Sequence, residues 1–562
     1  MVRCSRLLVA LAGVNALPIS VGQTVLPSAA GLHQSRPAGY VGSKACFACH
    51  EGIYRSFLKT DMGRSMRAAS DFDPASLPAS ASVPIGSSNR MLRVFHDQKG
   101  WHQSETEAGV FSEEHTLEYV VGSGANGLTF LIRRGNCLFQ APLSFYSRIG
   151  KWDVSPGYET IDIGFTRAVP EACLACHSGR TQPVANRKGA YQDPPFSELA
   201  IGCENCHGPG EQHVRTAGKR SGSIVNPAKL SPRLAEEICM NCHQRGDTRI
   251  LQPGKTFADF RPGQWLIDTL AIFKAPARPG EHPESDLLEH DAAMRASRCF
   301  RESAGKLSCL TCHDPHVQPR GSETVSYFRE KCFTCHTDSS CRLAKDIRLK
   351  HNPPDDCAGC HMPKRNVALI SHSALTNHRI PATANTPGPP QEQRDSKTGL
   401  ILVNRTPGQN EPIPDLTLLR AYGELAGRDA DYQRRYLELL ERLGSTDTKE
   451  PFVQAAAGHK ALAEGKNEAA LAHLTAAAPL DDSAVYSDAA QALINLGRAP
   501  EAVDYLKRAE AVDPFNPVVQ KTLILQYINL KRYPDARRAM EDYVKTFPAD
   551  TFMRNLLARV SN

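Results

Sequence analysis

Seven copies of the pattern Cys-x-x-Cys-His occur in this 562-residue chain and use fourteen of its 18 cysteines. Each copy places two thiols three positions apart, with a histidine directly after the second thiol. The seven copies are Cys46, Cys49 and His50; Cys173, Cys176 and His177; Cys203, Cys206 and His207; Cys239, Cys242 and His243; Cys309, Cys312 and His313; Cys332, Cys335 and His336; and Cys357, Cys360 and His361.

Two thiols at this spacing can reach the two vinyl groups of one porphyrin and form thioether bonds. The adjacent histidine then lies under the iron and becomes its proximal ligand. We therefore predict seven covalently bound haem c groups, held by the fourteen motif cysteines, with the seven motif histidines on the iron. Covalent attachment also lets a chain hold many haems with little protein core around each one.

Two other readings of the cysteines explain less. Paired Cys-x-x-Cys units can form zinc ribbons, and the units at 309–312 and 332–335 have a plausible separation. Neither zinc sites nor disulfides require a histidine after every second cysteine. Cys4, Cys137, Cys299 and Cys341 lie outside the motifs. A disulfide between Cys299 and Cys341 is expected, because these two cysteines flank two of the motifs.

Seven six-coordinate irons need seven distal ligands, and thirteen histidines lie outside the motifs. Most of the candidates stand close to a motif in the sequence. His115 opens the β-rich segment, and Met62 could ligate through its thioether. They are His213, His316, His372, His378, His290, His115, Met62 and His351. His459 and His473 lie far from the motifs and are expected to be surface residues.

The segments around the motifs predict the elements that position them. Residues 90–165 contain short apolar runs separated by Gly-rich turns, which indicates a small β-rich insertion. Six motifs then crowd into residues 173–361, where we expect short helices and loops with few strands. The predicted haem-bearing domain covers residues 23–380, and the Pro, Gly, Asn and Thr content of residues 381–414 is typical of a linker.

Residues 415–562 contain no cysteine and show helical periodicity. Ala502 and Ala536 are 34 residues apart, as are Pro514 and Pro548. This period resembles the tetratricopeptide repeat, in which a small Ala lets paired helices approach closely. The predicted fold is therefore a mainly α multihaem cytochrome with little regular structure around the haems, a small β insertion and a C-terminal α-solenoid. Such a tail would bind protein partners; a plain helical bundle is the alternative.

The ends and the charge of the chain suggest where it works. Residues 1–22 combine Arg3 and Arg6 with a short apolar run, as in a signal peptide, so we expect a periplasmic or otherwise exported protein. No later run is long enough to be a transmembrane segment of the mature chain. The formal charge of +6 falls to roughly −1 once each ferric haem adds about −1, so no nucleic-acid partner is expected.

Three motif segments resemble a known group. Residues 41–50, 203–213 and 309–316 resemble the nitrification-type tetrahaem cytochrome c and hydroxylamine oxidoreductase superfamily. The Cys-His-Met-Pro-Lys run at 360–364 resembles the same superfamily and the pentahaem nitrite reductases. Over roughly residues 40–380 and the tail, the chain resembles bacterial multihaem cytochromes that end in tetratricopeptide repeats. The resemblance implies that His213 and His316 are distal ligands and that the haems stack in close pairs.

The departures from that group concern catalysis. The nitrite reductases use a Cys-x-x-Cys-Lys haem, and this chain has no such motif. The tyrosine that hydroxylamine oxidoreductases cross-link to haem cannot be identified here. Resemblance alone therefore does not make the protein an enzyme.

Three functions follow from these patterns. The first is electron transfer through covalent haems, with the tail docking redox partner proteins; the chain could also form a homo-oligomer. The second is an oxidoreductase acting on a small nitrogen or sulfur compound at a five-coordinate haem, for which motif one or two is the candidate. The third is a sensor whose tail carries the main function, but no signalling output domain accompanies it.

Overall fold

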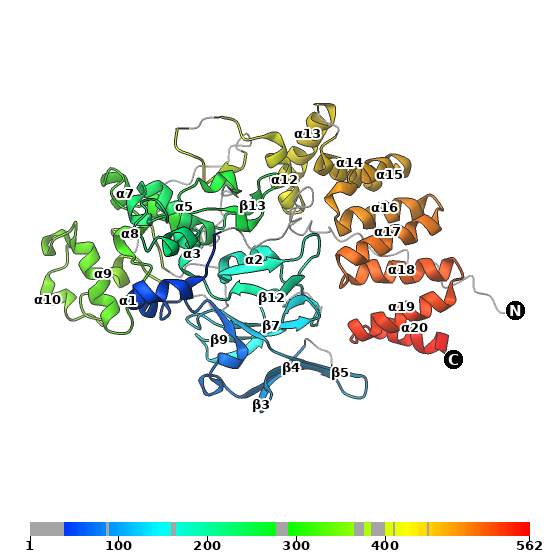
Figure 1. Cartoon of the computed structure of the whole chain (residues 1–562), viewed down its shortest axis with the longest axis horizontal. Helices are drawn as coiled ribbons and strands as arrows, with labels where there is room; N and C mark the ends of the chain where they lie inside the picture. The colour runs from blue at the N-terminus through cyan, green and yellow to red at the C-terminus, as the bar shows by residue number, and fades with distance from the viewer. Residues whose placement is uncertain are drawn as a thin grey trace.

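The computed structural model describes residues 39–85, 89–158, 164–276, 290–364, 376–383, 399–408, 411–446 and 449–561. The signal peptide predicted over residues 1–22, Cys4 and His372 lie outside these ranges. Figure 1 shows the motif-bearing helices on one side of the molecule, the longest β-strands below them and the tail helices as a stack on the other side. Within the described ranges, no helix has both the length and the apolar character needed to cross a bilayer.

Two antiparallel four-stranded sheets form the β insertion. One has the order β2 (Ser80–Pro84), β3 (Arg90–Asp97), β4 (Gly100–Glu107) and β5 (Phe111–Thr116). The other has the order β1 (Met66–Ala68), β6 (Tyr119–Val121), β7 (Thr129–Arg134) and β8 (Cys137–Gln140), and β9 (Leu143–Tyr146) pairs with β10 (Lys151–Val154). The first strand therefore begins at Met66, before residue 90, where the sequence predicted that the β-rich insertion begins.

The core of the β insertion is aromatic. Trp101, Phe130 and Trp152 come from three strands and lie in one buried cluster with Phe139. Trp152 contacts both Trp101 and Phe130, with ring centroids 5.8 and 5.2 Å apart. The buried side-chain amide of Gln103 donates to the carbonyl oxygen of Leu143 and accepts from its N–H, each at 2.8 Å. These contacts lock β4 of the first sheet onto β9.

Short helices carry the motifs, as expected. Motif one spans η1 (Ser43–Cys46) and α1 (Phe47–Phe57), and the other six lie on or at the ends of helices. These helices are α2 (Glu171–His177), α3 (Cys203–His207), α5 (Pro232–His243), α8 (Cys309–Cys312), α9 (Glu323–Phe333) and α11 (Cys357–His361). Between them lie α4 (Glu211–Arg215), α6 (His290–Ala296), α7 (Arg298–Glu302) and α10 (Lys345–Arg348).

The region of the six crowded motifs contains more strands than we expected. β11 (Arg180–Pro183) pairs with β12 (Tyr191–Glu198), and β13 (Thr248–Leu251) pairs with β14 (Leu270–Lys274). β15 (Ile401–Leu402) joins β14 from the segment that the sequence suggested was a linker. The side-chain amide of the buried Asn404 fixes this junction, because it accepts from Ile272 N and donates to Leu270 O. Each strand is too short to show a clear alternation in the sequence.

The C-terminal tail is helical, as predicted. It comprises α12 (Asp415–Leu425), α13 (Ala430–Thr446), α14 (Pro451–Ala463), α15 (Asn467–Ala476), α16 (Ser483–Asn495), α17 (Ala499–Val512), α18 (Pro517–Asn529), α19 (Tyr533–Thr546) and α20 (Thr551–Ser561). Each helix packs against the next one in the chain. Ala470, Ala502 and Ala536 are at most 1% exposed, which places a small side chain at the same point of three successive helix pairs.

The tail contacts the rest of the chain through α12, through the α17–α18 turn and through Arg554 of α20, whose guanidinium lies 5.5 Å from the centre of the Phe111 ring in β5. At one end, α12 packs against β13, where Arg420 donates to the carbonyl oxygen of Leu251 at 2.6 Å. Further along the tail, Phe515 in the α17–α18 turn packs onto the core of the β insertion, with its ring centroid 4.5 Å from that of Phe139. Next to it, Lys188 Nζ lies 3.3 Å from the carboxylate of Asp513.

Replacing Phe515 by Ala should loosen the second contact. The change removes a half-buried aromatic ring and the cation–π contact of Arg134 with it, so we expect a loss of about 1–3 kcal/mol. Hydrogen exchange at residues 511–517 should accelerate, and so should proteolysis there. Phe552→Ala is the matched control, because that ring is 58% exposed. Equal effects of the two changes would show that Phe515 does not hold the tail.

Candidate haem-binding centres

The seven motifs have the local geometry that thioether attachment requires. Residues three apart on a helix share one face, so both cysteines of a motif lie on the same side of its helical turn. Helix α3 begins at Cys203 and ends at His207, and α11 begins at Cys357 and ends at His361, so these two helices consist of the motif alone. No disulfide joins any of the fourteen motif cysteines. Cys299 and Cys341 are free as well, so the disulfide expected between them is wrong.

Contacts between motif helices join the seven motifs into one cluster. The helix η1 packs on α3, α2 packs on α5, and α9 packs on both α8 and α11. These contacts link motif one with three, two with four, and five with six and seven. The remaining links come from side chains. A hydrogen bond between the thiols of Cys239 and Cys309 joins motifs four and five, and the facing rings of His207 and His316 link motif three with the segment after motif five.

Thiols of different motifs lie within hydrogen-bonding distance of each other. The bond between Cys46 and Cys203 raises the pKa of Cys46 and lowers that of Cys203 to about 6. A bond with Cys242 likewise lowers the pKa of Cys176 to about 5. Thioether formation would remove these protons, so the shifts matter here as a sign of close packing: attachment points of separate motifs lie side by side.

Three pairs of imidazoles have the separation of two axial ligands. Two metal–nitrogen bonds of about 2 Å, with the radius of each ring added, place the centroids of two such imidazoles about 6 Å apart. His50 and His213 are 6.3 Å apart with ring planes at 14°. His207 and His316 are 6.0 Å apart at 20°, and His313 and His378 are 6.3 Å apart at 34°.

The three pairs share one offset along the chain, which we call staggered pairing. His213 follows motif three but faces His50 of motif one, and His316 follows motif five but faces His207 of motif three. His378 follows motif seven and faces His313 of motif five. In each case the second imidazole comes from the segment after the motif two positions further on. The sequence selected these three histidines but did not indicate their partners.

A fourth candidate, His290, lies among motif histidines. Its ring is 5.4 Å from His243 of motif four and 4.6 Å from His378. Burial, with the neighbouring imidazoles, lowers the pKa of His243 to about 4 and that of His378 to about 4. Both rings are therefore neutral at physiological pH, which is the form that can bind iron.

The hydrogen bonds of these rings leave the correct nitrogen available. A metal-binding histidine commonly donates from one ring nitrogen to a carbonyl or carboxylate and binds the metal with the other. Nδ1 has such a partner in six of the rings, in which it contacts a backbone carbonyl (His207, His290, His361 and His378), the Asp314 carboxylate (His316) or the Ser223 hydroxyl (His213). This leaves Nε2 of each ring for iron.

A cavity of about 1350 Å³ lies between the motifs. Its wall includes Cys176, Cys206, Cys242, His243, Cys309 and His313, so four motifs open into it. The volume exceeds the roughly 300–1,000 Å³ of sites for single small ligands. The hydroxyl of Tyr327, also in the wall, is buried and has no hydrogen-bond partner in the described part of the chain. Thiols, neutral imidazoles and this unsatisfied polar group fit several haems with their carboxylate side chains.

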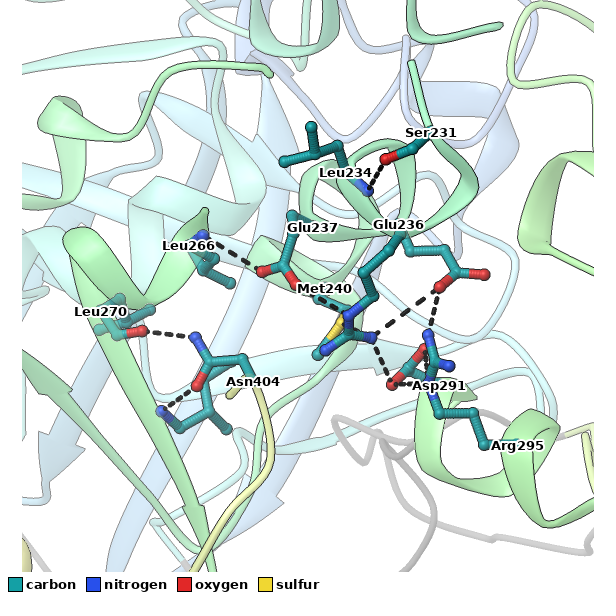
Figure 2. A network of polar contacts seen from close by, with 12 residues as sticks. Ser231, Leu234, Glu236, Glu237, Met240, Leu266, Leu270, Asp291, Arg295 and Asn404 are labelled. Carbon is teal, nitrogen blue, oxygen red and sulfur yellow. Dashed lines mark hydrogen bonds and ion pairs between the residues drawn. The ribbon is translucent and has the colours of Figure 1, made fainter. Parts of the chain in front are cut away.

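A buried ionic network holds the helix of His290 against the helix of motif four (Figure 2). Glu236 and Glu237 of α5 and Asp291 of α6 are at most 4% exposed. Arg233 contacts Glu237 at 3.3 Å and Asp291 at 3.4 Å, and Arg295 bridges Asp291 at 3.0 Å and Glu236. Burial raises the pKa of Glu237 to about 7. The network places His290, next to Asp291, beside His243.

The remaining candidate ligands have different positions. Met62 lines the cavity, so a role on iron stays a prediction. His351 is exposed after α10, and His372 lies outside the described residues. Nε2 of the His115 ring bonds the Glu113 carboxylate at 2.7 Å, and the ring packs on Phe165. No ring contact joins His115 to a motif histidine within the described residues, so its role as a ligand stays a prediction. The polar residues of β5 did not indicate, from the sequence, that His115 would bond Glu113.

One of the two candidates for an open iron site, motif one, has an imidazole facing its motif histidine. Motif one was a candidate for a five-coordinate haem, because few histidines stand near it in the sequence. His213 comes from more than 160 residues away and faces His50. Tyr327 and the network of Arg233, Asp291 and Arg295 were missed by the sequence reasoning. Their types are common on protein surfaces, and only the fold brings them to the motifs.

Comparisons with known proteins agree with the motifs on the broad class. No family model matches the chain. It is 23% identical over 243 residues to the multiheme cytochrome MtrA of Shewanella baltica (strain OS185), across 41% of this chain and 66% of MtrA. It is 27% identical over 199 residues to the C-type polyheme cytochrome OmcB of Geobacter sulfurreducens (strain ATCC 51573 / DSM 12127 / PCA), across 29% of this chain and 25% of OmcB. The chain thus spans less than two thirds of the length of these curated relatives.

Similar solved structures include two proteins. The outer cell wall cytochrome OcwA matches with a TM-score of 0.37 and 15% identity, across 84% of this chain and 99% of OcwA. The MamA protein matches with a TM-score of 0.23 and 16% identity, across 25% of this chain and 80% of MamA.

The motifs and the curated relatives together support a multihaem c-type cytochrome. These relatives are not described as nitrification-type cytochromes or hydroxylamine oxidoreductases, so that narrower resemblance remains a prediction.

Replacing His316 by Ala tests the staggered pairing. The change removes the imidazole that faces His207, so the iron at motif three should lose one axial ligand and become high-spin. Electron paramagnetic resonance of the oxidised protein should show one new high-spin centre.

The matched control is His115→Ala, in which a histidine bonded to Glu113 is removed. All irons should keep their spin state in this variant. A low-spin spectrum for His316→Ala, or a new high-spin signal for His115→Ala, would contradict the assignment.

Proposed function

We propose that this protein is an exported heptahaem c-type cytochrome that carries electrons through its covalently bound haems. Bound haem c supplies reversible one-electron oxidation and reduction of iron. The observation that carries the proposal is the contiguity of the motifs: every motif touches another through helix packing or through paired side chains. The names of the curated relatives support the same class.

The residues of the chain would hold and tune these groups. The motif cysteines fix each porphyrin at two points, and the staggered histidines supply the second axial ligand at motifs one, three and five. Two imidazoles give a lower reduction potential than the His/Met combination of single-haem cytochromes c. Burial keeps His243 and His378 neutral, so protonation does not compete with iron for these nitrogens.

The tail would provide the docking role. Its stacked helices expose large apolar side chains toward the C-terminus, including Val518, Tyr533 and Phe552, which are 66%, 61% and 58% exposed. Exposed apolar residues on a helical stack are typical of protein-binding surfaces. A redox partner protein, or a second copy of this chain, is the partner that this role requires. An exported location, periplasmic or beyond, fits covalent haem attachment and belongs to the proposal.

The haem count is the first test. The protein is produced in a host competent in cytochrome maturation, and its intact mass is measured. We expect seven added porphyrin groups, and one fewer when Cys357 and Cys360 are both changed to Ser. Cys137→Ser is the control, because this buried cysteine lies outside the motifs and its loss should leave the count at seven. A colourless protein without added mass would refute the proposal.

The spin state of the oxidised protein separates electron transfer from the oxidoreductase alternative. Histidine pairs at motifs one, three and five predict low-spin iron there. Electron paramagnetic resonance is recorded before and after addition of nitrite, hydroxylamine or sulfite. A spectrum that none of the three changes supports electron transfer. A high-spin signal that shifts with one of them would show a substrate-binding iron and favour an enzyme.

A further inference from the structure

A buried carboxylate lies inside motif three, at one of the two positions that the Cys-x-x-Cys-His pattern leaves unspecified. Glu204 stands between Cys203 and Cys206, and it is only 5% exposed. Burying a charged carboxylate costs free energy unless hydrogen bonds replace its water. The side chain must therefore be held by partners, and those partners reveal what it connects.

Three backbone N–H groups from two other segments donate to Glu204. Val41 N donates to both oxygens, at 3.0 and 3.2 Å, and Gly42 N donates to Oε2 at 2.7 Å. Gly210 N donates to Oε1 at 2.7 Å. Charge-assisted bonds of this kind are about twice as strong as neutral ones.

The two segments carry the two imidazoles of the first pair. Val41 and Gly42 directly precede η1, which leads into Cys46, Cys49 and His50. Gly210 is the N-cap residue of α4, the short helix on which His213 lies. One carboxylate thus ties the approach to His50 and the start of the His213 helix to the backbone of motif three.

The glycines on either side fit this arrangement. A Cβ atom at position 210 would lie 3.2 Å from Glu204 Oε1 and 3.5 Å from Val41 Cγ2, so a larger residue there would press on the carboxylate. Gly42 has a φ of 82°, a left-handed conformation that other residues rarely adopt. Both glycines let the backbone come close enough to donate to the carboxylate.

We propose that Glu204 is a positioning residue that sets His50 and His213 on opposite sides of the iron at motif one. The inference rests on the proposed function, because it requires haem at that motif. Through its three bonds, Glu204 fixes two segments whose rings lie 6.3 Å apart and within 14° of parallel.

The test is Glu204→Gln, studied in the full chain with its haems attached. The amide keeps the shape of the side chain but replaces one acceptor oxygen with a donor, so three N–H groups face a single acceptor. We expect one of the seven irons to gain a high-spin fraction, as in His213→Ala. Glu211→Gln, which removes an exposed carboxylate from α4 itself, should leave all spin states unchanged.

A double variant separates positioning from general damage. If Glu204 acts through His213, then Glu204→Gln with His213→Ala should show no more high-spin iron than His213→Ala alone. An additive increase, or a Glu204→Gln protein with all irons low-spin, would overturn the inference. If Glu204→Gln does not fold, Gly210→Ala replaces it, because its Cβ presses on the same carboxylate oxygen.

The intact mass of the unmodified protein distinguishes the two proposals. A chain without haem at motif one would overturn the proposed function and this inference together. A chain with seven haems whose spectrum does not respond to Glu204→Gln overturns the inference alone.

Discussion

The structure depends on holding two imidazoles about 6 Å apart when they come from distant parts of the chain. The second ring of each assigned pair comes from the segment after the motif two positions further on, so motif three interlocks with motif one, and motif five with motif three. Ligation of this kind works as a set of cross-links. It closes long loops, and each closed loop limits the conformations of the chain around the others.

Buried charges set the orientation of these pairs. Glu204 bonds the segments of His50 and His213, and Asp291 ties the helix of His290 to α5 through Arg233. A buried ion pair adds little net stability, but the loss of one partner leaves an uncompensated charge that costs about 3–5 kcal/mol. Such groups are therefore better suited to fixing one geometry than to increasing stability. An electron-carrying protein needs that property, because axial ligation sets the potential of each iron.

The parts of the protein that were predictable from sequence are those whose signal is local. Each Cys-x-x-Cys-His motif spans five residues, and the 34-residue period of the tail follows pairs of neighbouring helices. The structure shows helices at both. The partners of His213 and His316 could not be predicted, because they depend on contacts across more than 100 residues. The β13–β14–β15 sheet was missed, since β15 is a two-residue strand in a Pro- and Gly-rich segment. The bond between His115 and Glu113, two residues before it, was not indicated by the polar residues of β5.

The contacts of α12, of the α17–α18 turn and of Arg554 hold the tail against the rest of the chain. Arg420 bonds the end of β13, which begins five residues after His243 of motif four. Asp513 pairs with Lys188, which lies between motifs two and three. A solenoid joined only by a linker would sample many orientations, and a partner bound to it would reach the haem-bearing part at an effective concentration set by linker length. A tail held at several points along its length instead presents a bound partner in one orientation, which would favour transfer between fixed redox centres.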